Sequence, residues 1–187
     1  DVEPHEYEQL ERLITGDYTT EERILLDVEV IKEDGSKHYL AVNDAVVARG
    51  QLSKTIDLHL TLDGDEISKY RADGLLFATP TGSTAYSLSA GGPILAPKME
   101  CILMTPVCPH SLFSRSVLFS GESELSVHVK IPEECCCVLT IDGEKNVPIL
   151  ATDRVVIRKS DLKLKLALLH NRNFYKLLNE KLKERDF

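Results

Sequence analysis

The sequence predicts a mainly β fold, in which antiparallel strands form a sandwich-like domain with a few short helices. Apolar and polar residues alternate at 24–31 and 56–63, and a period of two is typical of half-buried strands. Asp-Gly pairs occur at 34–35, 63–64 and 142–143, each after an alternating run, where they favour hairpin turns. Repeated short strands separated by turns favour a sandwich over a doubly wound fold.

The individual elements follow in chain order. Pro4 suits an early helical position and Gly16 suits a helix end, which predicts a short helix between them. We expect a second helix near Ala85 and a closing helix over 174–182, with an exposed connection over 92–100. Strands are predicted at 24–31, 38–42, 56–63 and 75–77, from Cys101 onward, and at 125–131, 138–141, 155–157 and 163–168.

A hydroxyl-rich loop follows the apolar segment Leu75–Phe77. Pro80 ends the strand because it lacks a backbone donor, and Gly82 lets the backbone approach a ligand or adopt positive φ. Two interpretations remain open: a pocket that binds a polar ligand, or a Ser/Thr turn that caps the following helix. The loop hydroxyls belong to Thr79, Thr81, Ser83 and Thr84.

Composition indicates one globular domain and excludes several classes of partner. The chain has 187 residues, 43% hydrophobic and 28% charged, enough to bury a core of ordinary size. A formal net charge of −8 argues against nucleic acid and anionic membranes as partners. No apolar run approaches the ~20 residues that span a bilayer, and we expect a cytoplasmic protein. The five cysteines, three of them consecutive at 135–137, fit small apolar residues better than disulfides or a metal site.

Several ordered segments together resemble the NAD kinase family. The segments at 73–74, 79–86 and 89–93 are similar to its NAD-binding signature. Four further stretches also match in order, and together the segments cover nearly the whole chain: Asn43-Asp44 with Arg49-Gly50, 105–111, 142–144 and 174–182. The resemblance implies a β-rich carboxy-terminal domain with few helices, in agreement with the alternation.

The same resemblance implies a reaction. NAD kinases phosphorylate the 2′-hydroxyl of the adenosine ribose of NAD to give NADP, using ATP or inorganic polyphosphate with Mg²⁺ or another divalent cation. The family's Gly-Gly-Asp-Gly-Thr motif, which carries its key catalytic aspartate, does not occur in this sequence. We therefore expect residues 1–187 to be a single domain, the NAD-binding part of a larger enzyme, without a catalytic residue or metal ligand of its own and inactive when alone.

The matched positions supply a set of candidate NAD-binding residues. The resemblance places Thr84 and Ala85 against adenine, Asp73 on the nicotinamide side, and Arg71 and Lys54 near the diphosphate or ribose. The full set is Asn43, Asp44, Lys54, Arg71, Asp73, Thr81, Thr84, Ala85, Tyr86, Ser89, Cys108, Gly143 and Glu144.

The chemistry of these residues supports some roles and leaves others open. The Asn43 amide both donates and accepts, which suits a ribose or an adenine edge. Tyr86 offers a plane that stacks on a base, or else packs in the core beside its helix. Asp44 stands where the family has glutamate, and Glu144 where it has glutamine. We interpret His110 and Arg115 as structural, with His110 buried or capping.

The resemblance also implies assembly and alternatives. Family members are homodimers or homotetramers in which a neighbouring subunit completes the nicotinamide pocket, with Cys108 and Lys54 as contributors here. A lipid kinase of the diacylglycerol or sphingosine type, and a non-catalytic module that senses NAD or NADP, are the competing hypotheses. A hydroxyl-dominated loop favours a dinucleotide over acyl chains.

Overall fold

A computed structural model describes residues 4–50, 55–110, 115–130, 136–169 and 173–185. These residues divide into two compact units. Unit 1 comprises Asp1–Arg23 with Leu164–Phe187, and unit 2 comprises Ile24–Lys163. Each unit is described by itself below, and the single domain expected over 1–187 stays a prediction.

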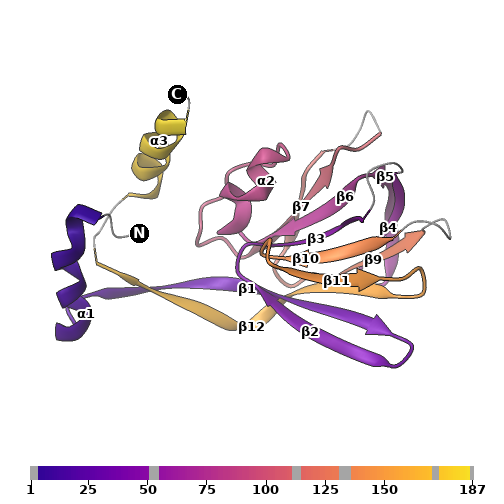
Figure 1. Ribbon diagram of the computed structural model, residues 1–187, viewed down its shortest axis with the longest axis horizontal. Helices are drawn as coiled ribbons and strands as arrows, with labels where there is room; N and C mark the ends of the chain where they lie inside the picture. Colours follow the sequence, from indigo (N-terminus) through magenta and orange to yellow (C-terminus); the bar gives the residue numbers. More distant parts are fainter. Residues whose placement is uncertain (1–3, 51–54, 111–114, 131–135, 170–172, 186–187) are drawn as a thin grey trace. The chain divides into compact units, whose positions relative to one another are not determined.

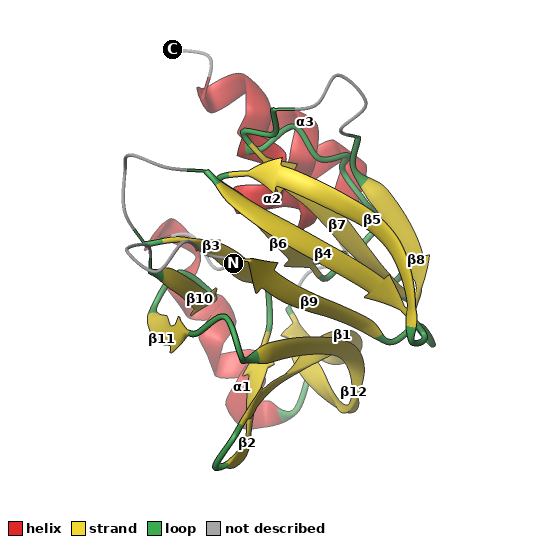
Figure 2. Cartoon of the chain, turned by 90° about the vertical axis from the view of Figure 1, so that its right-hand side faces the viewer, coloured by secondary structure: helices red, strands yellow, loops and turns green. Residues whose placement is uncertain are grey.

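The strands form two six-stranded sheets. All strand pairs with an assigned register are antiparallel. The first sheet has the order β2 (Gly35–Ala41), β1 (Thr19–Lys32), β12 (Arg154–Leu168), β9 (Leu125–Lys130), β4 (Ile56–Leu62) and β5 (Asp65–Ala72). The second has the order β11 (Lys145–Ile149), β10 (Cys137–Ile141), β3 (Asp44–Arg49), β6 (Gly74–Ala78), β7 (Cys101–Val107) and β8 (Val117–Ser120). Figure 2 shows β4, β5 and β9 of the first sheet in front of β3, β6 and β7 of the second.

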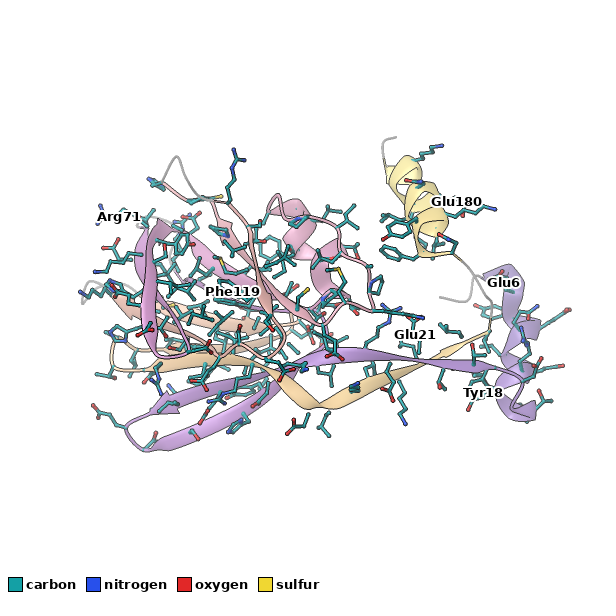
Figure 3. All side chains as sticks on the ribbon, turned by 180° about the vertical axis from the view of Figure 1, so that it is seen from behind. Glu6, Tyr18, Glu21, Arg71, Phe119 and Glu180 are labelled. Carbon is teal, nitrogen blue, oxygen red and sulfur yellow. The ribbon has the colours of Figure 1, made fainter. Side chains whose placement is uncertain are left out.

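The main core lies between the two sheets, which confirms the predicted sandwich. Leu58 and Leu60 of the first sheet and Phe77 of the second have no exposed surface and belong to one apolar cluster. Phe119 of β8, labelled in Figure 3, packs against this cluster. Full burial of such side chains stabilises a fold by about 1.5–3 kcal/mol each. The alternation read from 56–62 thus marks one buried face of β4.

The second sheet is also covered on its outer face. All five residues of β6 are buried, and a second apolar cluster joins Leu76 and Ala78 of β6 with Leu95 and Leu103. A short helix, α2 (Tyr86–Ser89), lies next to β6 (Figure 1). The expectation of an exposed connection over 92–100 is therefore wrong at Leu95, which is 5% exposed because it covers this face.

One strand replaces two predicted ones near the carboxy terminus. The expected strands at 155–157 and 163–168 are both parts of β12. The charges between them interrupt the apolar alternation but do not interrupt the extended backbone. Arg158 pairs with Glu29 and Glu124, at 3.0 and 2.8 Å, and Lys159 pairs with Glu100 at 3.1 Å.

Unit 1 contains the remaining helices. The predicted amino-terminal helix is a 3₁₀ turn, η1 (Pro4–Leu10), followed by α1 (Glu11–Thr15). It ends at Gly16 as predicted, since that residue has a left-handed φ of 75°. The closing helix is confirmed as α3 (Phe174–Arg185). None of the described helices combines the length and the apolar character needed to cross a membrane.

Candidate functional site

The segment Val42–Asp44, which we call the Asn43 corner, is held by the carboxylate of Asp142. The Asp142 oxygens accept the backbone N–H groups of Val42 at 2.8 Å, Asn43 at 2.7 Å and Asp44 at 3.0 Å. The Asp142 N–H donates to the Asp44 carbonyl at 2.9 Å. Asp142 and Gly143 have left-handed φ values of 49° and 73°, which close the hairpin between β10 and β11. The hairpin turn therefore fixes the corner that precedes β3.

The loop after β6 holds the same corner from the other side. The Thr79 N–H donates to the Asn43 carbonyl at 2.9 Å, and the Thr79 hydroxyl donates to the Val42 carbonyl at 2.7 Å. The hydroxyl of Thr79 also accepts the Gly82 N–H at 3.0 Å. Both backbone polar groups of Asn43 are thus engaged, so that its backbone is fixed and its amide side chain remains for other interactions.

Gly82 is required by packing and not by positive φ. A Cβ atom at this position lies 2.0 Å from the Asn43 carbonyl oxygen, far inside any van der Waals contact. Gly82 is also absent from the described residues with positive φ. The expectation of positive φ at Gly82 is therefore wrong, and the close neighbour that the structure shows is the Asn43 corner.

The carboxyl of Asp44 is buried beside Asp142. Asp44 is 5% exposed. Burial raises the pKa of its carboxyl to about 6, and the nearby charge of Asp142 is a second, smaller cause of this rise. Near neutral pH Asp44 is ionised, although burial and the charge of Asp142 both disfavour its charged form. The structure therefore gives the Asp44 position an energetic cost that the sequence did not reveal.

We expect Asp44→Asn to raise the free energy of unfolding at pH 8 by about 1–3 kcal/mol. The folded protein binds the Asp44 proton more tightly than the unfolded chain does, because the folded pKa of about 6 exceeds the ordinary value of 3.8. The free energy of unfolding of the wild type therefore falls as pH rises from about 4 to about 6, because Asp44 loses its proton over this range. The asparagine variant has no such proton and lacks that loss. Urea unfolding at pH 4 and pH 8 measures the difference, which should vanish at the lower pH. Equal gains at both pH values, or a similar gain in the exposed control Glu144→Gln, would contradict it.

The loop between Thr79 and Ser89 separates into buried and accessible hydroxyls. Ser83 donates to the Pro80 carbonyl at 2.7 Å and accepts the Leu95 N–H at 3.0 Å. The buried Ser87 hydroxyl bonds with that of Thr105 at 3.2 Å. Together with Thr79, these buried side chains shape the loop.

The accessible residues of the loop are those predicted to bind. Thr81 and Thr84 are half-buried, whereas Ala85, Tyr86 and Ser89 are exposed. Tyr86 is 48% exposed, so the alternative of core packing is wrong. The expected helix near Ala85 is divided into the 3₁₀ turn η2 (Gly82–Thr84) and α2, and neither has a side-chain cap. The capping interpretation therefore does not explain these hydroxyls.

Asp73 forms an ion pair that the sequence did not predict. Its carboxylate faces the Arg49 guanidinium, with Nε to Oδ1 and Nη2 to Oδ2 both at 2.8 Å. The two side chains are 22% and 24% exposed. This pair lies at the start of β6, whereas the Asn43 corner adjoins its end.

The other candidate residues are placed more peripherally. Arg71 lies on β5, an edge strand (Figure 3), and pairs with both carboxylate oxygens of Asp57 at 2.8 and 3.1 Å. This pairing lowers the pKa of Asp57 and raises that of Arg71. Cys108 is exposed with a positive φ of 45°. Gly143 and Glu144 are exposed in the β10–β11 turn, and Lys54 lies outside the described residues.

Two expectations about neighbouring residues are corrected or refined. His110 is exposed rather than buried, because only its backbone is tied down, through its N–H to the Arg71 carbonyl at 2.8 Å. Cys101 and Cys137 are buried as expected of apolar residues, and burial raises the pKa of both thiols, that of Cys137 to about 12. Cys136, in contrast, is exposed.

Carboxylates of the described residues do not gather into a cation site. No group of three or more His, Cys, Asp or Glu side chains suited to a metal occurs among them. Mg²⁺ is usually held by carboxylates, but both Asp142 oxygens already accept backbone N–H groups and Asp44 is buried. The residues of this corner therefore do not fit a divalent cation.

The fold matches that of kinases named for NAD or NADH. Yeast NADH kinase in complex with NADH is similar in structure, with a TM-score of 0.85 and 27% sequence identity. The match covers 95% of this chain and 54% of the yeast chain. An NAD kinase from Archaeoglobus fulgidus in complex with ATP is also similar, with a TM-score of 0.77 and 26% sequence identity. This match covers 94% of this chain and 64% of the Archaeoglobus chain.

Sequence comparison gives the same assignment. NAD kinase from Natranaerobius thermophilus is 40% identical over 174 residues, covering 92% of this chain and 60% of that protein. NAD kinase from Magnetococcus marinus is 40% identical over 179 residues, covering 94% and 58%. The family described as the ATP-NAD kinase C-terminal domain matches residues 42–169. The chain belongs to this family, and it spans about 60% of the length of these curated relatives.

Sequence reasoning missed two residues of the site. Asp142 and Arg49 both lie in segments that resemble the family, and Asp142 was also interpreted as part of a hairpin turn, but neither side chain was given a role. An Asp before Gly after a short strand is common in turns, so the pattern alone carries no sign of a distant partner. The sequence indicates a partner for the Arg49 side chain even less, since a single arginine at a strand end is usually solvated.

Proposed function

We propose that this chain is the NAD-binding part of an NAD kinase, which phosphorylates the 2′-hydroxyl of the adenosine ribose of NAD to give NADP. The observation that carries this proposal is the junction at the Asn43 corner. Three segments that resemble the family join there through hydrogen bonds to backbone groups, namely 42–44, 79–82 and 142–143. All three lie within the residues matched by the family.

The chemistry of phosphoryl transfer suits such a junction. Transfer to a ribose hydroxyl depends on positioning the acceptor in line with the donor and on electrostatic stabilisation. A corner whose backbone is held from both sides supplies a fixed amide, that of Asn43, to orient the ribose. The accessible hydroxyls of Thr81, Thr84 and Ser89 add neutral donors and acceptors.

Adenine recognition is assigned to the exposed part of the loop. Backbone groups at Ala85 and the Thr84 hydroxyl suit the amino group and ring nitrogens of the base. The exposed ring of Tyr86 suits stacking on a base, because its apolar face is accessible and its hydroxyl remains solvated. Gly143 and Glu144 flank the corner on its other side.

The phosphate donor belongs to another part of the protein in this proposal. ATP or polyphosphate, with Mg²⁺ or another divalent cation, would be held by the portion of the relatives that this chain does not match. Yeast NADH kinase and the Archaeoglobus fulgidus NAD kinase were solved with NADH and with ATP, respectively. These ligands correspond to the two substrates proposed here.

Assembly and location are further parts of the proposal. We expect a cytoplasmic homodimer or homotetramer, in which Cys108 and Lys54 of one subunit approach the dinucleotide of its neighbour. Cys108 is exposed at the end of β7 and has a constrained backbone, which supports a role at a contact.

The decisive experiment is a kinase assay on the full-length gene product. NAD with ATP or polyphosphate and Mg²⁺ should give NADP, whereas this chain alone should give none. Absence of NADP with every donor, together with phosphorylation of a diacylglycerol or sphingosine lipid, would overturn the proposal in favour of a lipid kinase. Binding of NAD or NADP without turnover would favour a sensing module.

Substitution of the accessible ring tests the loop directly. Tyr86→Ala in the full-length gene product should weaken NAD binding about tenfold, because stacking on an aromatic ring contributes about 1–3 kcal/mol. Asp73→Ala should weaken it by a similar factor. Isothermal titration calorimetry measures both, with Tyr18→Ala and Asp65→Ala as controls, because Tyr18 and Asp65 are also exposed and are not among the proposed binding residues. Unchanged affinity in both test variants would show that the loop does not bind NAD.

A further inference from the structure

We propose that Arg49 is a positioning residue, which holds the Asp73 carboxylate in the orientation that receives the distal half of the dinucleotide. This inference rests on the proposed function. It adds a role for a residue that belongs to none of the candidate ligand contacts.

The geometry of the pair fixes the carboxylate plane. Two adjacent guanidinium nitrogens of Arg49 meet the two oxygens of Asp73, each at 2.8 Å. A fork of this kind sets the orientation of a carboxylate as well as its charge, which a lysine does not do. An ionised carboxylate has about four lone-pair directions, so the two bonds to Arg49 leave two with which Asp73 can accept donors from a ligand.

The backbone around the pair is fixed as well. The Arg49 N–H donates to the Asp73 carbonyl at 2.9 Å, and the Asp73 N–H donates to the Val107 carbonyl at 3.0 Å. Asp73 is thus held between the ends of β3 and β7. Since both side chains are about one quarter exposed, the carboxylate is restrained and still accessible.

The location of the pair separates it from the Asn43 corner. Asp73 precedes β6 and Thr79 follows it, and six residue steps in a strand correspond to about 20 Å. A mononucleotide held at the Asn43 corner would not extend over this length. A dinucleotide, with its second nucleoside beyond the diphosphate, is the ligand that can use both ends of β6.

A double-mutant cycle tests the proposal in the full-length gene product. Arg49→Met should weaken NAD binding about tenfold, as expected for loss of a charged hydrogen-bond partner, and should leave AMP affinity within about twofold. In an Asp73→Asn background the same change should have less than about a twofold effect, because Arg49 acts through Asp73. Arg49→Lys should give an intermediate loss. Arg158→Met is the matched control, since Arg158 is also an ion-paired arginine but lies on the first sheet, where it pairs with Glu29 and Glu124.

The outcomes separate this inference from the proposed function. Calorimetry with NAD and with AMP reports each affinity, and the Lys variant serves if the Met variant does not fold. An Arg49→Met variant that binds NAD normally while Asp73→Ala does not would overturn the role of Arg49 alone. Equal losses for NAD and AMP, or an undiminished loss in the Asp73→Asn background, would assign Arg49 a purely structural role. Normal NAD binding in Asp73→Ala would instead remove Asp73 from the proposed site.

Discussion

Asp142→Ala is expected to lower the free energy of unfolding by about 2–4 kcal/mol and to abolish measurable NAD binding. Three backbone N–H groups, those of Val42, Asn43 and Asp44, lose their shared charged acceptor. The Asn43 corner would then be held by the loop after β6 and by the one backbone bond from residue 142 to the Asp44 carbonyl. The loss is partly offset, because removal of the Asp142 charge relieves the neighbouring Asp44 carboxyl, whose pKa it helps to raise.

Urea unfolding and calorimetry with NAD measure the two effects of Asp142→Ala. Asp142→Asn should fall between wild type and alanine, because its one amide oxygen can replace only part of the carboxylate. Glu144→Ala is the matched control for the unfolding measurement, since Glu144 lies in the same turn and is exposed. If the Asp142→Ala and Glu144→Ala proteins were equally stable, the hairpin turn would not hold the corner.

Gly82→Ala is expected to destabilise the protein by about 2–4 kcal/mol and to weaken NAD binding by more than about tenfold. The added methyl group would lie 2.0 Å from the Asn43 carbonyl oxygen. Since that oxygen belongs to backbone that is hydrogen-bonded on both sides, it cannot move away without breaking the bond to Thr79.

Gly91→Ala is the informative comparison for Gly82. Gly91 has open space around its Cβ position but a left-handed φ of 86°, so alanine there should cost about 1–2 kcal/mol through backbone strain alone. It should leave NAD affinity close to that of wild type. A Gly82→Ala protein as stable as wild type and fully able to bind NAD would show that the corner yields easily.

The fold was predictable wherever burial imposes a period of two. Residues 56–62 alternate because one face of β4 contacts the core, and the two-sheet arrangement follows from several such runs. The apolar run 75–77 also identified a buried strand correctly. Strand prediction failed in the charged middle of β12, where two strands were expected and one is present. There, charged side chains pair across strands and the apolar alternation is absent.

The site was predictable in its segments but not in its internal bonds. Ordered resemblance identified the loop at 79–89 and the turn at 142–144, because each is continuous in sequence. The contact of Asp142 with the Asn43 corner joins residues about a hundred positions apart, and no local pattern reports it. Likewise, Ser83 and Thr84 look equivalent in sequence, and each hydroxyl donates to the carbonyl three residues before it, yet the tertiary fold buries Ser83 against Leu95 and leaves Thr84 half-buried.

Coverage of β6 on both faces has a consequence for the entropy of binding. The strand has β3 and β7 as neighbours and is fully buried. Buried central strands are among the parts of a protein that open least readily, and the Thr79–Gly82 segment directly follows this strand. A ligand that binds at the Asn43 corner need not order that corner first, and little conformational freedom is lost there. Most of the contact energy at this end of β6 is therefore retained as affinity.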